Sequence, residues 1–321
     1  MRLSGSNLFS MLALAMFFGI TCSAQAQDKY PSRPIHLIVP FAAGGAADLV
    51  ARLIGQSVSE RLGQPVVVEN KPGATGAIGG LMVARAQPDG YTLLTAVISS
   101  NAVLPAMKKN PPFDPVKDFT PIVRIANSIH ALVARNSLPV SDVKELIAYA
   151  KAHPVKVTYG SSGIASFPYL GAKLMEREAG IEMVHVPYPG DAPAMMSVAS
   201  GNVDILFTPS ARTYVESKTV KLIGVATLQR TPTYPNWPTL NETGLRGFAL
   251  VGWVGFMGPK GMPQTIVEKI NAAVNDSLKT PAVQQKLDQI GYAVAGGSAA
   301  EYAKDIRDEV ERIRSLNISI E

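Results

Sequence analysis

The segment PIHLIVPFAAGGAADLVARLIGQSVSERL, residues 34–62, decides the fold class. Residues 35–39 form a short apolar, β-branched run, which predicts a buried strand. A glycine-containing turn follows, and from residue 46 to 62 the apolar side chains recur every three or four positions, which predicts an amphipathic helix. Because strand, turn and helix recur in this order along the chain, we expect a parallel sheet covered by helices.

The same patterns outline the rest of the chain. We expect further strands at residues 66–68, 91–96, 155–159, 183–186, 203–207 and 220–226. We expect helices up to residue 152, with Ser141 as N-cap, over 169–179, and through most of the C-terminal portion, where Ser298 and Glu301 form a capping-box pair. Residues 105–121 read as irregular. Residues 122–134 and 248–257 read as long extended stretches, and the alternation restarts after about residue 128, which predicts a second domain.

The first 26 residues have the pattern of a cleaved signal peptide. Arg2 precedes an apolar segment at residues 8–20, which is too short to span a bilayer, and Ala24-Gln25-Ala26 is a small-x-small cleavage site. The alternatives are a membrane anchor, or a lipoprotein modified at Cys22, for which residues 19–21 are a poor match. We expect cleavage after Ala26, which removes Cys22, the only cysteine.

Composition excludes several classes of protein. Of the 321 residues, 47% are hydrophobic and 17% are charged, which excludes a mainly disordered chain. The formal net charge of +5 is spread without a basic stripe, so we expect no nucleic-acid partner. No segment after the leader approaches the 18 uninterrupted apolar residues of a membrane-spanning helix.

The sequence also lacks catalytic, metal-binding and cofactor motifs. The four histidines, at positions 36, 130, 153 and 185, have no further metal ligand at suitable spacing. The glycine spacings match neither G-x-G-x-x-G nor the P-loop. Gly160-Ser161-Ser162-Gly163 departs from G-x-S-x-G, because Ile164 stands where the last glycine belongs. We therefore expect no catalytic residues, no metal and no cofactor.

Two turns of one design, residues 41–48 and 160–166, are the candidate binding elements. Each joins a buried strand to a helix N-terminus, where backbone N–H groups and the helix dipole favour an anion. Neither turn contains Lys or Arg, which suits a carboxylate better than a polyphosphate. The alternative is that both are ordinary strand–helix loops in which Asp48 and a serine cap the helices.

At these residues the chain resembles a known family. The motifs are residues 30–35 (YPSRPI), 39–48 (VPFAAGGAAD), 68–76 (VENKPGATG), 88–93 (PDGYTL), 114–122 (DPVKDFTPI), 159–163 (YGSSG), 185–188 (HVPY) and 253–255 (WVG). In this order they resemble the periplasmic solute-binding proteins of tripartite tricarboxylate transporters, the Bug or TctC-like family. The likeness covers essentially all of the mature chain.

The resemblance implies a type II periplasmic-binding-protein fold, in which two α/β lobes joined by crossover strands close on a ligand. Residues 27–127 would begin lobe 1, 128–249 would form lobe 2, and 250–321 would complete lobe 1. It implies a periplasmic, monomeric, non-enzymatic receptor that binds a small carboxylate for membrane permease subunits. The alternatives are a sensing module for a signalling kinase and, less favoured, an enzyme on the same fold.

The resemblance also implies the ligand-binding residues. These are Phe41, Ala43, Gly44, Gly45, Asp48, Asn101, Gly160, Ser161, Ser162, Ala165, Ser166, Tyr169, Thr208 and Trp253.

Four positions depart from the family pattern. Ala165 replaces a glycine, Tyr169 a histidine, Pro189 a lysine, and Thr208 an aspartate. The missing lysine predicts a monocarboxylate ligand with an apolar or aromatic body rather than a citrate-like one, because a second buried carboxylate would lack a charge partner. Phe167, Tyr169 and Trp253 are the candidate apolar walls.

Overall fold

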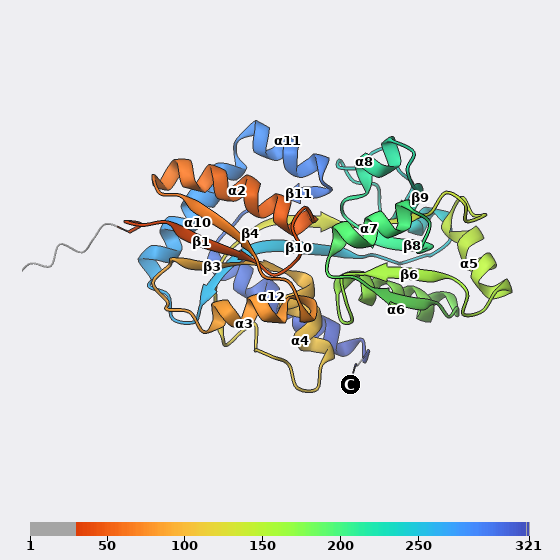
Figure 1. Cartoon of the computed structure of the whole chain (residues 1–321), viewed down its shortest axis with the longest axis horizontal. Helices are drawn as coiled ribbons and strands as arrows, with labels where there is room; N and C mark the ends of the chain where they lie inside the picture. Colours follow the sequence, from red (N-terminus) through yellow and green to blue (C-terminus); the bar gives the residue numbers. More distant parts are fainter. Residues whose placement is uncertain (1–29, 319, 321) are drawn as a thin grey trace, which may run out of the picture.

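The computed structural model describes residues 30–318 and residue 320, so the predicted signal peptide and Cys22 lie outside the described residues. The described chain forms two α/β lobes, each with its own sheet (Figure 1). The prediction of two α/β lobes joined by crossover strands is confirmed. No helix of this part of the chain is long and apolar enough to cross a membrane.

Lobe 1 contains a six-stranded sheet in the order β11-β4-β10-β3-β1-β2. The strands are β1 (Ile35–Val39), β2 (Val66–Asn70), β3 (Thr92–Val97), β4 (Phe119–Ile129), β10 (Val251–Pro259) and β11 (Tyr292–Val294). β1 is parallel to β2 and β3, whereas β10 is antiparallel to β3 and β4. The chain thus returns to lobe 1 through β10, in the middle of the sheet.

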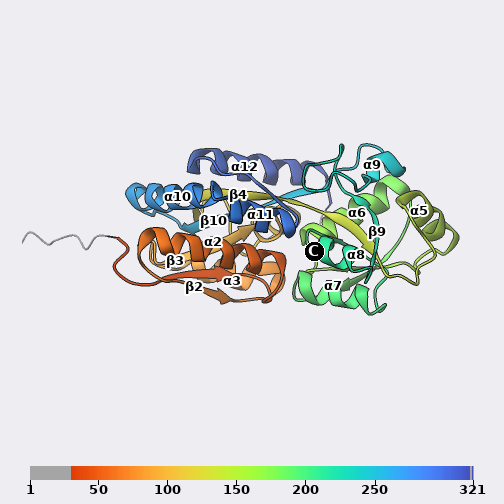
Figure 2. The ribbon, with the colours of Figure 1, turned by 90° about the horizontal axis from the view of Figure 1, so that it is seen from above.

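Helices cover both faces of this sheet (Figure 2). They are α2 (Ala46–Leu62), α3 (Ala77–Ala84), α4 (Leu104–Met107), α10 (Gln264–Leu278), α11 (Pro281–Gln289) and α12 (Ala299–Ser315), with a 3₁₀ turn at Ala74–Gly76 and a π-helical turn at Ser99–Val103. In α2, Val50, Ile54 and Val58 are buried against β1 at the spacing that predicted the helix. The sequence therefore directs one face of α2 into the core and leaves its N-terminus at the end of β1.

Lobe 2 contains a five-stranded sheet in the order β7-β6-β8-β5-β9. The strands are β5 (Ala131–Ala134), β6 (Thr158–Ser161), β7 (Val184–Pro187), β8 (Ile205–Thr208) and β9 (Lys221–Val225). The helices are α5 (Val143–Ala152), α6 (Phe167–Ala179), α7 (Asp191–Ala199), α8 (Ala211–Glu216) and α9 (Leu240–Thr243). β6 is parallel to β7 and β8, so the helices that follow β6 and β7 both begin at the same edge of the sheet.

The lobes are joined at the point where β4 passes through His130 into β5 and where β10 begins. The Ala226 N–H donates to the His130 carbonyl at 2.8 Å, and the Leu250 N–H donates to the Ala226 carbonyl at 2.8 Å. Both crossing segments are visible between the lobes in Figure 1. The lobe boundaries at 127/128 and 249/250 stay a prediction, since β4 continues through the first of them to Ile129.

Three local predictions differ from the structure. The N-cap of α5 is Asp142 rather than Ser141, because the Asp142 carboxylate accepts from the Glu145 N–H at 2.8 Å. The stretch called irregular includes part of α4, whose proline at the second helical position is compatible with a helix start. Strand β6 also begins later than expected, at Thr158, because Val155 has a φ of 57° and lies in a turn.

Candidate functional site

Two adjoining cavities lie between the lobes, and Phe41 and Ser162 line both. The inner cavity, of about 70 Å³, is bordered by Phe41, Gly45, Ala46, Ala47, Val97, Ile98, Ser99, Ser128, His130, Ser162, Phe167, Pro168, Asp191, Pro209, Trp253 and Tyr292. The outer cavity, of about 430 Å³, is bordered by residues 73–76 and 162–164 with Phe41, Leu104, Lys108, Pro187, Tyr188, Pro189 and Ile320. Both lobes contribute to each cavity.

The turn between β1 and α2 forms one wall of the inner cavity. Gly44 has a φ of 77°, a conformation that favours glycine, and its N–H donates to the Asp48 carboxylate at 2.9 Å. The Ala46 and Ala47 N–H groups lie in the first turn of α2 and have no acceptor among the described residues. This turn therefore presents backbone donors and the positive end of the helix dipole to the cavity.

Asp48 holds this turn in place from behind the cavity. It is 2% exposed, and besides Gly44 it accepts from Arg52 Nε at 3.0 Å and from Asn70 Nδ2 at 2.9 Å. Burial alone raises the pKa of the Asp48 carboxyl, but these hydrogen bonds together outweigh it, so its pKa lies below the usual value. Asp48 does not border the inner cavity, and Ala43 and Gly44 lie at the exposed edge of the turn.

The N-terminus of α7, in lobe 2, meets this turn across the cleft. A Cβ built on Gly45 would lie 3.8 Å from the Ala192 nitrogen and 3.8 Å from the Asp191 Cβ. The Asp191 and Ala192 N–H groups, in the first turn of α7, have no acceptor among the described residues. Two helix N-termini from opposite lobes therefore face each other, which is a favourable place for one anion.

Sequence reasoning did not find the α7 contribution. The available signal was a third strand–Gly–helix turn at residues 186–191, Val-Pro-Tyr-Pro-Gly-Asp. What the sequence does not show is that this turn ends opposite Gly45, because the contact depends on how the two lobes are placed.

The predicted turn after β6 has fewer donors to offer than expected. The Ser161 hydroxyl bonds His185 Nε2 at 2.6 Å and the Gly163 backbone, and Ser166 caps α6 by accepting from the Tyr169 N–H at 3.3 Å. The Phe167 N–H donates to Ser99 Oγ at 2.9 Å, which joins the lobes. Of this turn, Ser162 borders both cavities, and its hydroxyl has no partner among the described residues.

Gly160 and Ala165 shape this turn without bordering either cavity. Gly160 lies in β6, where an added Cβ would make ordinary contacts at 3.6–3.7 Å. Ala165 is fully buried with a φ of 61°, the left-handed conformation that the family's glycine would adopt more easily.

Three other predicted residues border neither cavity. Asn101 is fully buried and accepts from Ser100 Oγ at 2.7 Å. Tyr169 packs edge-on against His185, with ring centroids 4.9 Å apart. Thr208 is fully buried and donates to Asp191 Oδ1 at 2.7 Å. Position 208, where the family pattern has an aspartate, thus contacts the carboxylate of Asp191.

The crossover strands supply the floor of the inner cavity. Trp253 on β10 is 3% exposed and packs edge-on against Tyr302, while its Nε1 is buried without a hydrogen-bond partner in the described chain. Burial lowers the pKa of His130 to about 4, so its imidazole is neutral at pH 7. The floor is therefore uncharged at pH 7, and Phe167, another predicted wall, packs edge-on against His130, with ring centroids 5.1 Å apart.

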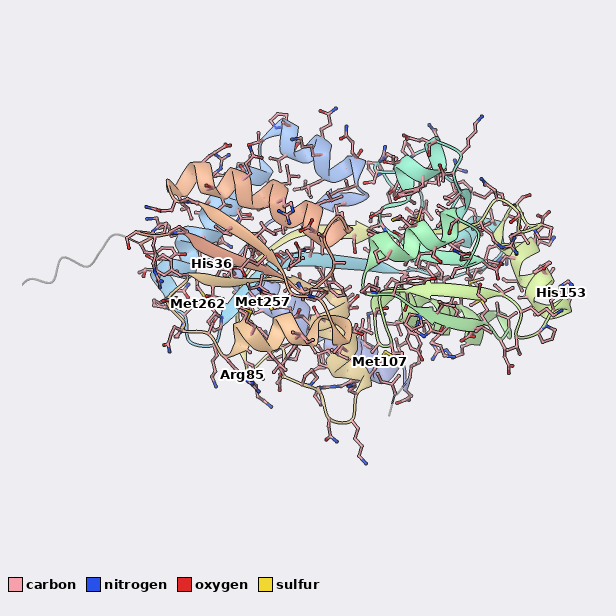
Figure 3. All side chains as sticks on the ribbon, in the orientation of Figure 1. His36, Arg85, Met107, His153, Met257 and Met262 are labelled. Atoms are coloured by element: carbon pink, nitrogen blue, oxygen red, sulfur yellow. The ribbon has the colours of Figure 1, made fainter. Side chains whose placement is uncertain are left out.

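Among the described residues no group of three or more His, Cys, Asp or Glu side chains could hold a metal ion. Figure 3 shows His36 in lobe 1 and His153 near the far end of lobe 2. His36 Nδ1 lies 2.6 Å from Glu69 Oε1, and the His153 ring stacks on Tyr149. Both have structural partners close by.

Comparison with known proteins identifies the family. Residues 50–320 match the model described as tripartite tricarboxylate transporter family receptor. The chain belongs to this family. A UPF0065 protein of Pseudomonas sp. is 37% identical over 95% of this chain and 91% of its own length. BugT of Bordetella pertussis is 30% identical over 95% of this chain and 96% of its own length.

Solved structures of receptors of this kind share the fold. BugD, a periplasmic binding protein, is 35% identical with a TM-score of 0.85 and covers 89% of this chain and 97% of its own. An R. palustris protein with adipate is 32% identical with a TM-score of 0.86 over 89% and 97%. MatC of Rhodopseudomonas palustris with bound malate is 32% identical with a TM-score of 0.85 over 89% and 99%. The predicted periplasmic-binding-protein fold is thus confirmed.

Proposed function

We propose that this receptor binds a small carboxylate between the N-termini of α2 and α7 and releases it to membrane permease subunits of a tripartite transporter. The observation that carries the proposal is the approach of these two helix N-termini from opposite lobes: a Cβ built on Gly45 would lie 3.8 Å from both the Ala192 nitrogen and the Asp191 Cβ. Their first-turn N–H groups lack acceptors among the described residues. A carboxylate placed there completes the hydrogen bonds of both lobes at once, so the ligand favours the closed arrangement.

The predicted site residues divide into three roles in this proposal. Gly45 and its two successors in α2 contact the carboxylate through the backbone, and Ser162 adds a hydroxyl from lobe 2. Phe41 and Trp253 form apolar walls. The remaining predicted residues hold the turns in shape; they are Ala43, Gly44, Asp48, Asn101, Gly160, Ser161, Ala165, Ser166, Tyr169 and Thr208.

Family membership supports the wider account. Relatives of the same fold hold adipate and malate, both small carboxylates. We propose that this chain is likewise a non-enzymatic binding protein, exported to the periplasm with cleavage after Ala26, and that it acts as a monomer. Because no catalytic residue, metal or cofactor enters the proposed role, closure around the ligand is its whole mechanism.

A thermal-shift screen of the mature protein tests binding. The panel is malate, adipate, citrate, benzoate, L-glutamate and L-leucine, which separates charge number from apolar bulk. An acid at about 100 times its dissociation constant should add about 2.7 kcal/mol to the free energy of unfolding. If no small carboxylate raises the melting temperature, the proposal fails.

Transport is tested separately in cells. Deleting the gene should abolish uptake of the acid that the purified protein binds, and restoring it should recover uptake. Unchanged uptake together with a lost transcriptional response to that acid would assign the receptor to sensing instead.

A further inference from the structure

Asp191 borders the inner cavity, and one of its two carboxylate oxygens has no hydrogen-bond partner in the described chain. Its Oδ1 accepts from Thr208 Oγ1 at 2.7 Å, whereas its Oδ2 is buried without a hydrogen-bond partner in the described chain. Burial raises the pKa of the Asp191 carboxyl, and the nearby hydroxyls of Thr208 and Ser210 oppose part of that rise. Ser210 Oγ is itself buried without a hydrogen-bond partner in the described chain, so it lies near Asp191 without closing a hydrogen bond to it. A buried carboxylate oxygen without a partner is unfavourable, so the site is built to receive a donor.

The cavity offers Asp191 no cationic side chain. Neither Lys nor Arg is among the described residues that line the inner cavity. Arg52 is held by Asp48 and Asn70 behind the α2 turn, and His130 is neutral at pH 7. A water molecule in the cavity would satisfy a lone pair of Oδ2 but would bring no positive charge.

A bound carboxylate would add a second acidic group to a cavity that has no cationic side chain. The Asp191 Cβ lies 3.8 Å from a Cβ built on Gly45, so Asp191 adjoins the turn that is proposed to hold the ligand's carboxylate. Two negative groups would then share one desolvated cavity, which strongly disfavours ionisation of both. A ligand with a positive charge next to its carboxylate would offset the repulsion between the two carboxylates.

We propose that the ligand carries an ammonium group beside its carboxylate, and that Asp191 Oδ2 accepts from this ammonium. The proposal rests on the proposed function and names the class of carboxylate: an amino acid with a compact apolar side chain. The short distance between Asp191 and Gly45 matches an amino acid in which one carbon separates the two charged groups. Phe41, Phe167 and Trp253, which border the inner cavity, receive the apolar side chain.

Two other ligand classes are chemically close. A hydroxy acid would give Asp191 Oδ2 a neutral donor, and a dicarboxylic acid could share a proton with Asp191. Neither brings a positive charge into the cavity, so the amino acid is favoured. The experiment separates all three.

Calorimetry of the mature protein at pH 7 provides the test, with matched probes that differ in one group. L-leucine is compared with 4-methylpentanoate, which lacks the ammonium, and with 2-hydroxy-4-methylpentanoate. L-valine is compared with 3-methylbutanoate, and malate represents dicarboxylates. We expect at least one amino acid to bind tenfold or more tightly than its deamino and hydroxy analogues and than malate.

The variant Asp191→Asn keeps the shape and the Oδ1 hydrogen bond from Thr208 but removes the charge. We expect it to lose the tenfold preference for the amino acid, while Asp276→Asn, which changes an exposed carboxylate on α10, keeps it. A preserved preference in Asp191→Asn overturns the proposal.

The comparison of ligands on the wild-type protein tests the amino-acid proposal even if the Asp191→Asn variant does not fold. If the deamino acid, the hydroxy acid or malate binds as tightly as the amino acid or more tightly, the amino-acid proposal is wrong. The proposed function as a carboxylate receptor would still hold. Failure of every acid to bind contradicts the proposed function itself.

Discussion

Replacement of Gly45 by valine tests the proposed carboxylate site most sharply. Gly45 is the N-cap of α2 with φ −77° and ψ 167°, an extended conformation that valine adopts readily. A Cβ at this position would make ordinary contacts, 3.5 Å from the Ala42 carbonyl oxygen and 3.8 Å from the Ala192 nitrogen. The two γ-methyl groups of valine reach further, into the gap between the two helix N-termini where the carboxylate is proposed to bind.

The expected loss can be estimated from the hydrogen bonds. A hydrogen bond to a charged group contributes about 1.5–3 kcal/mol, so losing the Ala46 and Ala47 donors weakens binding by about 3–6 kcal/mol, or roughly 10²–10⁴-fold. The fold should be almost unaffected, since replacing an N-cap glycine by a β-branched residue costs about 1 kcal/mol.

The assay is calorimetric titration with the tightest-binding acid of the screen, together with thermal unfolding of each variant. Gly45→Ala is the matched control: its methyl group fits, so its affinity should stay within about threefold of the wild type. Wild-type affinity in Gly45→Val would show that the α2 turn does not hold the ligand.

Three further predictions concern His130, the lobe contacts and the crossover strands. Because burial lowers the folded-state pKa of His130 to about 4, below the unfolded value of 6.5, the unfolded chain binds the proton first as pH falls. The free energy of unfolding should then drop by about 3 kcal/mol between pH 7 and 4 on account of this group, and denaturant titrations of His130→Gln should show a shallower slope; an equal slope would contradict it. Thr75 Oγ1 donates across the cleft to the Ile164 carbonyl at 2.6 Å, so Thr75→Val should weaken ligand binding about two- to tenfold in calorimetry, whereas unchanged affinity would show that this contact does not support closure. A Cβ on Gly252 would lie 2.5 Å from Ser128 Oγ, so Gly252→Ala should destabilise the fold by about 1–3 kcal/mol in urea unfolding, and a stability equal to that of the wild type would refute the tight packing.

Much of the architecture was predictable because local patterns agree with it. The period of apolar residues fixed α2 at Ala46–Leu62, and the capping box at Ser298 and Glu301 is confirmed at the start of α12. The two long extended stretches became β4 with β5, and β10, the elements that link the lobes. The secondary structure of long segments with a strong apolar pattern can therefore be predicted from their own residues.

The site was less predictable, for a physical reason. Serine and aspartate serve equally as ligand contacts and as helix caps, and the sequence does not show which role wins. Ser166 and Asp48 turn out to satisfy nearby N–H groups. Asp191 was missed because its importance depends on contact with Gly45 across the cleft, which no local pattern encodes.

A crystal structure of the mature protein with the tightest-binding acid of the screen tests the central claim most directly. The account predicts one carboxylate in the inner cavity, with its oxygens about 2.7–3.2 Å from first-turn N–H groups of both α2 and α7. A ligand that contacts the N-terminus of neither helix, for example one confined to the outer cavity beside Lys108, would contradict it.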